Sequence, residues 1–212
     1  MNREGLVLAE VRLSVAQRQL LAVDCTILPG EITTVMGPSG SGKSSLLAAV
    51  SGLLGQDFSA EGEVWLNGEC LNGLPAEARR IGLLFQDPLL YPHLSVAENL
   101  GFGLAPTKGE RRSDRAAKIS GALSRIGLQG FENRDPATLS GGQQSRVALM
   151  RLLLSEPRAV LLDEPFSALD AQLQDEIREL TFASIRAAKI PALLVSHDSR
   201  DARAAGGPLI SL

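Results

Sequence analysis

The sequence lacks the features that mark several large classes of protein. No apolar stretch in its 212 residues approaches the ~18–20 residues that a membrane-spanning helix needs. The segment after Met1 has no apolar core of the kind that a secretion signal carries. Positive charge is not in excess, because 21 Lys and Arg residues stand against 24 Asp and Glu residues, for a net charge of −3. We therefore expect a soluble, unexported chain with no bulk attraction to nucleic acid.

Cysteine and aromatic residues are scarce as well. Cys25 and Cys70 lie far apart and outside any Cys-x-x-Cys spacing, which fits two reduced thiols better than a disulfide or a zinc site. Aromatic residues make up 4% of the chain. Hydrophobic residues make up 44% and charged residues 21%, the proportions of a globular protein with a buried core. At roughly 100–200 residues per domain, the length predicts one domain.

Short apolar runs predict two kinds of strand. Continuous runs are typical of strands that are buried on both faces, as in a parallel sheet. Loosely alternating stretches, one of which runs into the turn Asn67-Gly68, predict a smaller antiparallel region. The continuous runs are Ile32–Met36, Ile81–Phe85, Ala159–Leu162 and Ala192–Val195, and the alternating ones are Leu6–Val15, Leu20–Leu28 and Glu63–Leu66.

Helical patterns separate these runs. The segment 87–157 contains helical patterns but no clear strand, so it predicts an inserted helical lobe. We expect a single α/β domain over 1–212, with a core lobe of 1–86 and 158–212, a mainly parallel core sheet and an N-terminal antiparallel region. The expected helices follow Lys43 and occupy about Asp114–Ile126, Gly141–Ser155 and Ala171–Ala188.

A glycine-rich loop joins the first parallel strand to the helix that follows. Gly37-Pro38-Ser39-Gly40-Ser41-Gly42-Lys43-Ser44 satisfies G-x-x-x-x-G-K-[ST], and an ordinary turn would not need Lys beside Ser at that register. Lys43 is placed to bridge β and γ phosphates, and the Ser44 hydroxyl to bind Mg²⁺. The motif predicts a P-loop NTPase whose nucleotide contacts come from Gly37, Ser39, Gly40, Ser41, Gly42, Lys43, Ser44 and Ser45.

Two carboxylates follow the run Ala159–Leu162. Groups at the carboxyl edge of a parallel sheet lie where α/β proteins bind ligands. Asp163 is placed to hold Mg²⁺ through water, and Glu164 to take the proton of an attacking water. Adjacent ionised carboxylates repel, so the pKa of one of them is expected to rise. Taken alone, such a pair is more often a solvated turn, and it is the phosphate loop that favours the catalytic interpretation.

The segment Leu139-Ser140-Gly141-Gly142-Gln143 combines a helix start with two glycines. Ser140 and Gln143 have the spacing of a capping box, so a helix is expected to begin at Gly141. Each glycine costs up to about 1 kcal/mol of helix propensity relative to Ala, so we infer that something approaches this backbone closely. An anion is the natural ligand of such a helix start.

These motifs resemble, in order and spacing, the ATP-binding subunit of ABC transporters. The likeness covers essentially the whole chain and includes the phosphate loop, Leu139–Gln143, Asp163-Glu164-Pro165, Ser167–Asp170 and His197. It implies ATP and Mg²⁺ as ligands and ATP hydrolysis as the activity. It also implies a homodimer that binds two ATP molecules head to tail, in which Ser140 and Gly142 serve the nucleotide held by the partner.

The resemblance assigns three further residues. Gln86 matches the glutamine that approaches Mg²⁺ and senses the γ-phosphate, so it is both a metal and a catalytic candidate. Asp170 matches the aspartate that crosses the dimer interface. His197, after the run Ala192–Val195, matches the switch histidine that contacts the γ-phosphate.

Several features resemble bacterial importers within that family. The segment Phe85–Val96 is similar to the importer segment that receives a permease helix, and Arg134–Thr138 lacks the Gly-Glu-Arg-Gly pattern of exporters. Only 15 residues follow His197, so we expect no C-terminal regulatory domain. The resemblance implies membrane permease subunits as partners, an extracytoplasmic solute-binding protein as an indirect partner, and a peripheral position on the cytoplasmic face of the membrane.

Two other functions fit the motifs less well. A soluble ABC ATPase that acts on DNA or the ribosome would carry coiled-coil arms or tandem nucleotide domains, yet only 52 residues separate Gln86 from Leu139. A P-loop kinase or GTPase would leave Leu139–Gln143 unexplained, and the chain has no Asn-Lys-x-Asp motif.

The expected base site lacks an aromatic residue. The family usually places an aromatic ring about two dozen residues before the phosphate loop, to stack on adenine, but the first aromatic residue here is Phe58. The aligned stretch is Arg12–Ala16, so Val15 or an aliphatic neighbour is expected to cover the base. This predicts weak base contact and little discrimination between ATP and GTP.

Overall fold

Five strands form a sheet whose central members are buried on both faces. Its order is β6-β7-β8-β3-β9, and β7, β8, β3 and β9 pair in parallel. Every residue of β8 is buried, as a continuous apolar run predicts. The parallel sheet is confirmed, and β9 adds an edge strand that the sequence patterns did not indicate. The strands are β3 (Ile32–Met36), β6 (Ile81–Leu84), β7 (Ala159–Asp163), β8 (Ala192–Val195) and β9 (Leu209–Ser211).

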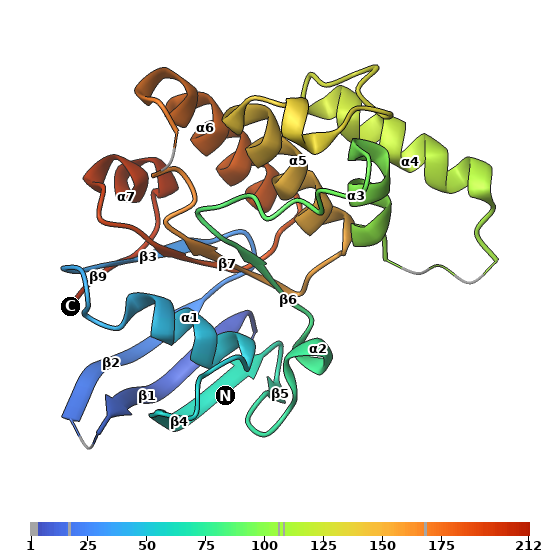
Figure 1. The fold of residues 1–212 in the computed structure, drawn as a ribbon. Helices are drawn as coiled ribbons and strands as arrows, with labels where there is room; N and C mark the ends of the chain where they lie inside the picture. The colour runs from blue at the N-terminus through green and yellow to red at the C-terminus, as the bar shows by residue number, and fades with distance from the viewer. Residues whose placement is uncertain (1–3, 17, 106, 108, 168) are drawn as a thin grey trace. The chain divides into compact units, whose positions relative to one another are not determined.

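Four strands form a second sheet, in the order β2-β1-β4-β5, and all its pairings are antiparallel (Figure 1). In β1 the register against β4 shifts between Ala9 and Arg12, so the buried positions change from Leu6 and Leu8 to Val11 and Leu13. The extra residue that causes this shift lies in β1 and not in β4. The strands are β1 (Leu6–Val15), β2 (Arg18–Ile27), β4 (Phe58–Leu66) and β5 (Glu69–Cys70), with the predicted turn Asn67-Gly68 between the last two.

Helix α1, Lys43–Ser51, connects the two sheets through the core. Its buried residues Leu46, Leu47 and Val50 belong to one hydrophobic cluster with side chains of both sheets, such as Leu13 and Leu161. The ribbon in Figure 1 shows α1 alongside β1, β2 and β4. Because the phosphate loop immediately precedes α1, this cluster holds the loop against the carboxyl end of the parallel sheet. Two short helices, α2 (Ala76–Arg79) and α7 (Ser199–Ala205), precede β6 and β9.

Helices make up the segment between β6 and β7. Ser140 and Gln143 form the predicted capping box at the start of one helix, and Ser95 and Glu98 form a second one at the start of another. Among the described residues of 87–157 there is no strand. The elements are α3 (Val96–Gly103), α4 (Arg112–Arg125), the 3₁₀ turn Pro136–Thr138 and α5 (Gly141–Leu154), and α6 (Ala171–Ala187) follows β7.

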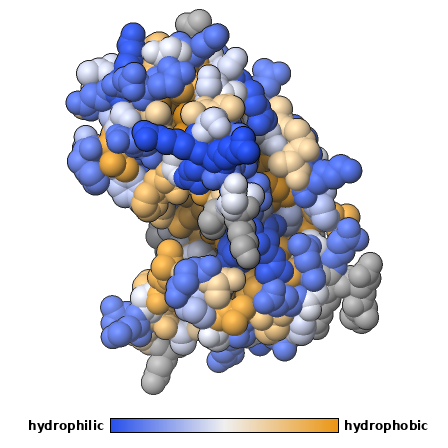
Figure 2. Space-filling view, turned by 90° about the vertical axis from the view of Figure 1, so that its right-hand side faces the viewer, coloured by the Kyte–Doolittle hydropathy of each residue, from blue (hydrophilic) through white to orange (hydrophobic). Residues whose placement is uncertain are grey.

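The structure is a computed structural model that describes residues 4–16, 18–105, 107, 109–167 and 169–212. The chain divides into a β-rich unit, residues 1–83, 157–165 and 178–212, and a helical unit, residues 84–156 and 166–177. The helical unit thus takes in 166–177, which the sequence patterns place in the core lobe. No helix in the described ranges has the length and hydrophobicity to cross a membrane. Figure 2 shows a face on which hydrophilic residues alternate with small hydrophobic patches.

Candidate functional site

The phosphate loop lies between β3 and α1 in the β-rich unit. Gly40 and Gly42 have φ of +80° and +90°, which glycine adopts without strain. Gly42 caps α1 in a left-handed conformation and offers no side chain to the first N–H groups of the helix. Those N–H groups have no partner within the helix, so they face the loop as donors for an anion.

Lys43 holds a nearly buried charge inside this loop. Its side chain is buried, with 7% of the residue exposed. Its Nζ donates hydrogen bonds to the carbonyls of Gly37 and Pro38, at 2.9 Å each. The Oγ of Ser41, next to these groups in the loop, is buried and has no hydrogen-bond partner among the described residues. A phosphate oxygen would supply an acceptor for both side chains, so the loop fits a polyphosphate.

Ser44 and Asp163 bring the loop and the strand β7 together. The Ser44 hydroxyl donates to Asp163 Oδ1 at 3.1 Å, although 119 residues separate the two in sequence. Burial raises the pKa of Asp163, the Ser44 hydrogen bond opposes the rise, and the charge of Glu164 adds to it. The expected rise at one of the two carboxylates therefore falls on Asp163, and desolvation is its main cause.

A hydroxyl and a carboxylate that touch one another suit Mg²⁺. This ion is commonly held by one or two protein oxygens, with water and substrate phosphates completing its octahedron. Among the described residues there is no cluster of three His, Cys, Asp or Glu side chains that could hold a metal without a substrate. The donor set therefore fits Mg²⁺ that arrives with a polyphosphate.

Glu164 and His197 form the second contact of the site. The Nδ1 of His197 lies 3.1 Å from Oε2 of Glu164, and the histidine side chain is 63% exposed. The backbone of Glu164 has a φ of +45°, an uncommon conformation for a side chain of this size, and its N–H donates to the carbonyl of Val195. The strand ends thus hold a carboxylate and an imidazole together at the edge of the sheet.

A buried polar network fixes the end of β8 next to His197. Ser196 donates its hydroxyl to Asp201, and Asp201 accepts from Nε of Arg178 at 2.7 Å, with both charged side chains 5% exposed. Ser196 Oγ also accepts from the N–H of Asp198. A paired charge at such burial is costly to disrupt, so the network defines the direction in which the chain leaves β8. The sequence patterns did not indicate it.

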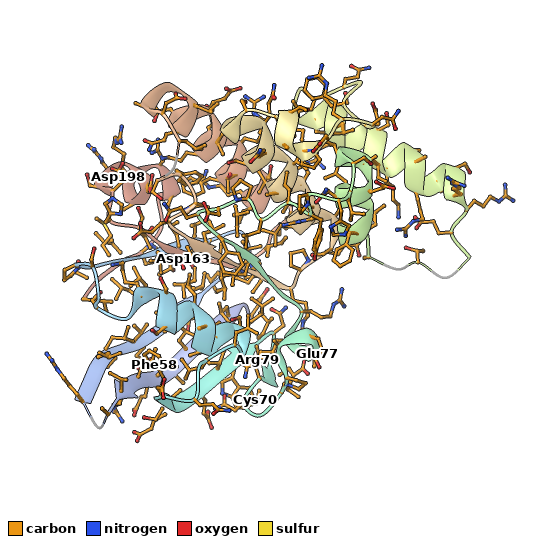
Figure 3. All side chains as sticks on the ribbon, in the orientation of Figure 1. Phe58, Cys70, Glu77, Arg79, Asp163 and Asp198 are labelled. Atoms are coloured by element: carbon orange, nitrogen blue, oxygen red, sulfur yellow. The ribbon has the colours of Figure 1, made fainter. Side chains whose placement is uncertain are left out.

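A cavity of about 440 Å³ opens on the phosphate loop, within the β-rich unit. Its apolar part comes from the aliphatic Val15 and Leu20 and from Phe58 (labelled in Figure 3), which was not expected there. The sequence pattern predicted Val15 or an aliphatic neighbour at this place, and the structure adds the aromatic ring of Phe58. The cavity is lined by Val15, Leu20, Ser39, Gly40, Gly42, Lys43, Ser44, Ser45, Phe58 and Glu164.

The long-range pairing of β1 with β4 explains Phe58. Val15 and Phe58 are register partners at the last step of that ladder. Phe58 has the same parity as the buried Val64 and Leu66, so its side chain lies on the core face of β4. The alternation along β4 could have placed Phe58 on that face, but only the pairing partner brings it beside the loop.

The other predicted site residues lie in the helical unit. Ser140 and Gly141 are exposed, and Ser140 closes its capping box with Gln143 at 3.0 and 3.3 Å. A Cβ on Gly141 would meet nothing within 4 Å, whereas one on Gly142 would clash with the side chain of Leu173. The close approach that we inferred at these glycines is thus made, at Gly142, by a side chain of the same unit.

Gln86 and Asp170 are both exposed. Gln86 follows β6 by two residues. Asp170 accepts the N–H of Leu173 at 3.0 Å and so caps the start of α6, while its neighbour Ala168 lies outside the described residues.

Comparison with known proteins agrees with this geometry. A family model described as "ABC transporter" matches residues 20–167. The chain is 47% identical over 198 residues to the uncharacterized ABC transporter ATP-binding protein YnjD of Escherichia coli K12, which covers 92% of this chain and 90% of YnjD. It is 44% identical over 183 residues to the thiamine import ATP-binding protein ThiQ of Cereibacter sphaeroides, with 86% and 78% covered.

Two further matches extend the comparison. The sulfate/thiosulfate import ATP-binding protein CysA of Xylella fastidiosa is 40% identical over 202 residues, which span 93% of this chain and 57% of CysA. Among solved structures, a dimeric post-hydrolysis state of the ATP-binding cassette MJ0796, bound to ADP and Pi, superposes with a TM-score of 0.79. That match is 31% identical and covers 98% of this chain and 94% of the other.

Proposed function

The chain belongs to the ABC transporter family of ATP-binding proteins, and from this premise we propose that it powers the import of a small solute through a separate membrane permease. It binds ATP with Mg²⁺ and hydrolyses it. The observation that carries the proposal is the pair of contacts Ser44–Asp163 and Glu164–His197, which gather the phosphate loop and the ends of two strands in one unit.

The phosphate loop and Asp163 would hold the triphosphate. Lys43 would exchange its two carbonyl partners for β- and γ-phosphate oxygens, and the N–H groups at the start of α1 would donate to the same group. Ser44 and Asp163 would hold Mg²⁺, with Gln86 as a third oxygen donor. Bound Mg²⁺ would neutralise charge on the phosphates as the terminal bond breaks.

Glu164 would act as the general base. Its Oε2 would take a proton from the attacking water, and His197, which is within hydrogen-bonding distance of that oxygen, would orient the carboxylate and contact the γ-phosphate. The positive φ of Glu164 supports this role, since strained backbone conformations cluster at functional sites.

The working unit would be a head-to-tail homodimer. Ser140 is exposed at the start of α5, where the helix dipole favours an anion, and Asp170 is exposed at the start of α6. We place Ser140 and Gly142 against the γ-phosphate held by the partner, and Asp170 at the interface. The dimeric state of the similar cassette MJ0796 supports this arrangement.

The loop before α3 would receive the permease, on the inner face of the membrane. Leu89 and Phe102 are 57% and 67% exposed, and Phe102 packs edge-on against Tyr91 with ring centres 4.7 Å apart. The fully buried Asn99 donates to the carbonyl of Tyr91, and Arg151 donates to that of Leu89, so the loop is held firmly behind its exposed side chains. The import ATP-binding proteins ThiQ and CysA support this direction of transport. A solute-binding protein would deliver the solute to the permease and so be an indirect partner of this chain.

Co-purification of the chain with permease subunits from its native membranes tests the proposal. Leu89→Asp puts a charge into the apolar contact, so we expect the permease to be lost from the complex while ATP binding is retained. Leu53→Asp, at a residue 60% exposed in the β-rich unit, is the matched control and should keep the permease. Equal recovery of permease with both variants, or recovery of DNA or ribosomes instead, would contradict the proposal.

A further inference from the structure

The cavity beside the phosphate loop has a polar part and an apolar part. The polar part consists of the loop itself with Lys43 and Glu164, and the apolar part of Val15, Leu20 and Phe58. A nucleoside triphosphate has the same two-part chemistry, because a charged triphosphate is joined to a flat, largely apolar base. Once the loop holds the phosphates, the base has the apolar part of the same cavity available to it.

Phe58 is suited to contact a base for reasons of position as well as chemistry. It is half-buried, and its cross-strand partner Val15 is too. On the same face of β4, Val64 and Leu66 are covered by the core, whereas Phe58 stands at the end of the strand, where the cavity opens. Figure 3 labels it at the beginning of β4. A phenyl ring left partly open in a cavity that also holds a phosphate loop has a face to offer a base.

We propose that Phe58 is the aromatic contact for the nucleotide base, and that it acts together with Val15 across the β1–β4 ladder. This inference rests on the proposed function only in that ATP occupies the cavity. The weak contact with aliphatic side chains that the sequence predicted is thereby replaced by a contact with an aromatic ring. The ring belongs to β4, a strand that follows the phosphate loop in sequence.

The side chains that line the cavity also determine whether contact with Phe58 can distinguish ATP from GTP. Among the described residues that line it, Val15, Leu20 and Phe58 carry no side-chain hydrogen-bonding group. Every base has a π face, so stacking is tolerant of its identity, whereas a preference for adenine would need hydrogen bonds to the base edge. Phe58 therefore raises the affinity for ATP and GTP alike.

Titration of the full chain with three ligands tests the assignment. The ligands are ATP, GTP and inorganic tripolyphosphate, each with Mg²⁺. Phe58→Ala is expected to weaken ATP and GTP by about tenfold to a hundredfold and to leave tripolyphosphate binding unchanged. Phe58→Tyr should restore nucleotide affinity, and Phe58→Leu should restore only part of it. Trp65→Leu is the control, because this aromatic residue lies on the opposite face of the same strand and should leave all three affinities unchanged.

A spectroscopic variant gives a direct readout. Phe58→Trp combined with Trp65→Phe leaves one tryptophan, in the cavity, and we expect ATP but not tripolyphosphate to quench its emission. Unchanged ATP affinity in Phe58→Ala, or equal weakening of ATP and tripolyphosphate, would overturn the assignment to the base. Either result would leave the proposed function standing, because in this titration that proposal is contradicted only if the wild-type chain binds neither a nucleotide nor tripolyphosphate.

Discussion

At the scale of single residues, the burial of charged groups at this site costs free energy of folding. Lys43 is nearly buried and satisfied by two carbonyls, while burial raises the pKa of Asp163. A carboxyl group whose pKa is raised by folding stabilises the fold at pH values below its unfolded pKa of about 3.9, and this contribution is lost as the pH rises through the folded value. Ionisation of Asp163 therefore destabilises the fold in the absence of nucleotide.

Asp163→Asn should accordingly raise the Tm of the nucleotide-free protein. We expect a gain of roughly 1–4 °C at pH 7, which shrinks as the pH falls toward about 4. The added stabilisation by Mg²⁺ and ATP should disappear in the same variant. Calorimetry between pH 4 and pH 8 measures both effects.

Asp198→Asn is the control, because its effect on the Tm should have the opposite sign. A hydrogen bond from Arg200 lowers the pKa of Asp198, so its contribution to stability is present above its unfolded pKa and is lost as the pH falls. Its replacement should lower the Tm at pH 7. The account of this site would be contradicted if Asp163→Asn had a Tm below that of the wild type at pH 7. It would also be contradicted if the difference between the two Tm values did not change with pH.

A site residue could be predicted from the sequence when the residues that fix its position are close to it in the chain. The phosphate loop and the two carboxylates follow strands directly, so motif and position together placed Lys43 and Asp163 correctly at the edge of the sheet. Phe58 and Leu173 escaped prediction because their relevant neighbours are distant in sequence. Val15 is brought to Phe58 by strand pairing, and Leu173 reaches Gly142 from another helix.

Secondary-structure elements follow the same rule. The loosely alternating stretch Leu6–Val15 and the continuous run Ile32–Met36 form strands with the predicted bounds. The three-residue strand β9 has too little sequence for a pattern, and it exists because it pairs with β3 from Thr34↔Leu209 onward. Helix α7 is also short, and it begins at Ser199, directly after its N-cap residue Asp198.

The start of α5 offers a test at this scale. Gly142→Ala places a Cβ against Leu173 and should lower the free energy of unfolding by about 1–3 kcal/mol, since overpacking forces neighbours to move. Gly141→Ala, one residue earlier and facing open space, should instead raise it by up to about 1 kcal/mol through helix propensity. Urea unfolding compares the pair. Equal stabilisation by both substitutions would mean that Leu173 does not constrain Gly142.

At the scale of the whole molecule, the two units divide the proposed work. The β-rich unit contains the phosphate loop, Asp163, Glu164 and His197, and the helical unit contains Ser140 and Gly142. A head-to-tail dimer lets the helical unit of one subunit complete the site of the other. The account therefore requires that ATP, when it is not hydrolysed, holds two chains together.

The most direct measurement of that claim is the mass of Glu164→Gln in ATP and Mg²⁺, by size exclusion with light scattering. The substitution keeps the shape of the side chain and removes the base, so hydrolysis should fall by about 10²–10⁴ while ATP binding survives. We predict a species of twice the 22.5 kDa chain mass, which Ser140→Arg in the same background should abolish. A variant that binds ATP yet stays at the mass of one chain, or that hydrolyses ATP at the wild-type rate, would contradict the account.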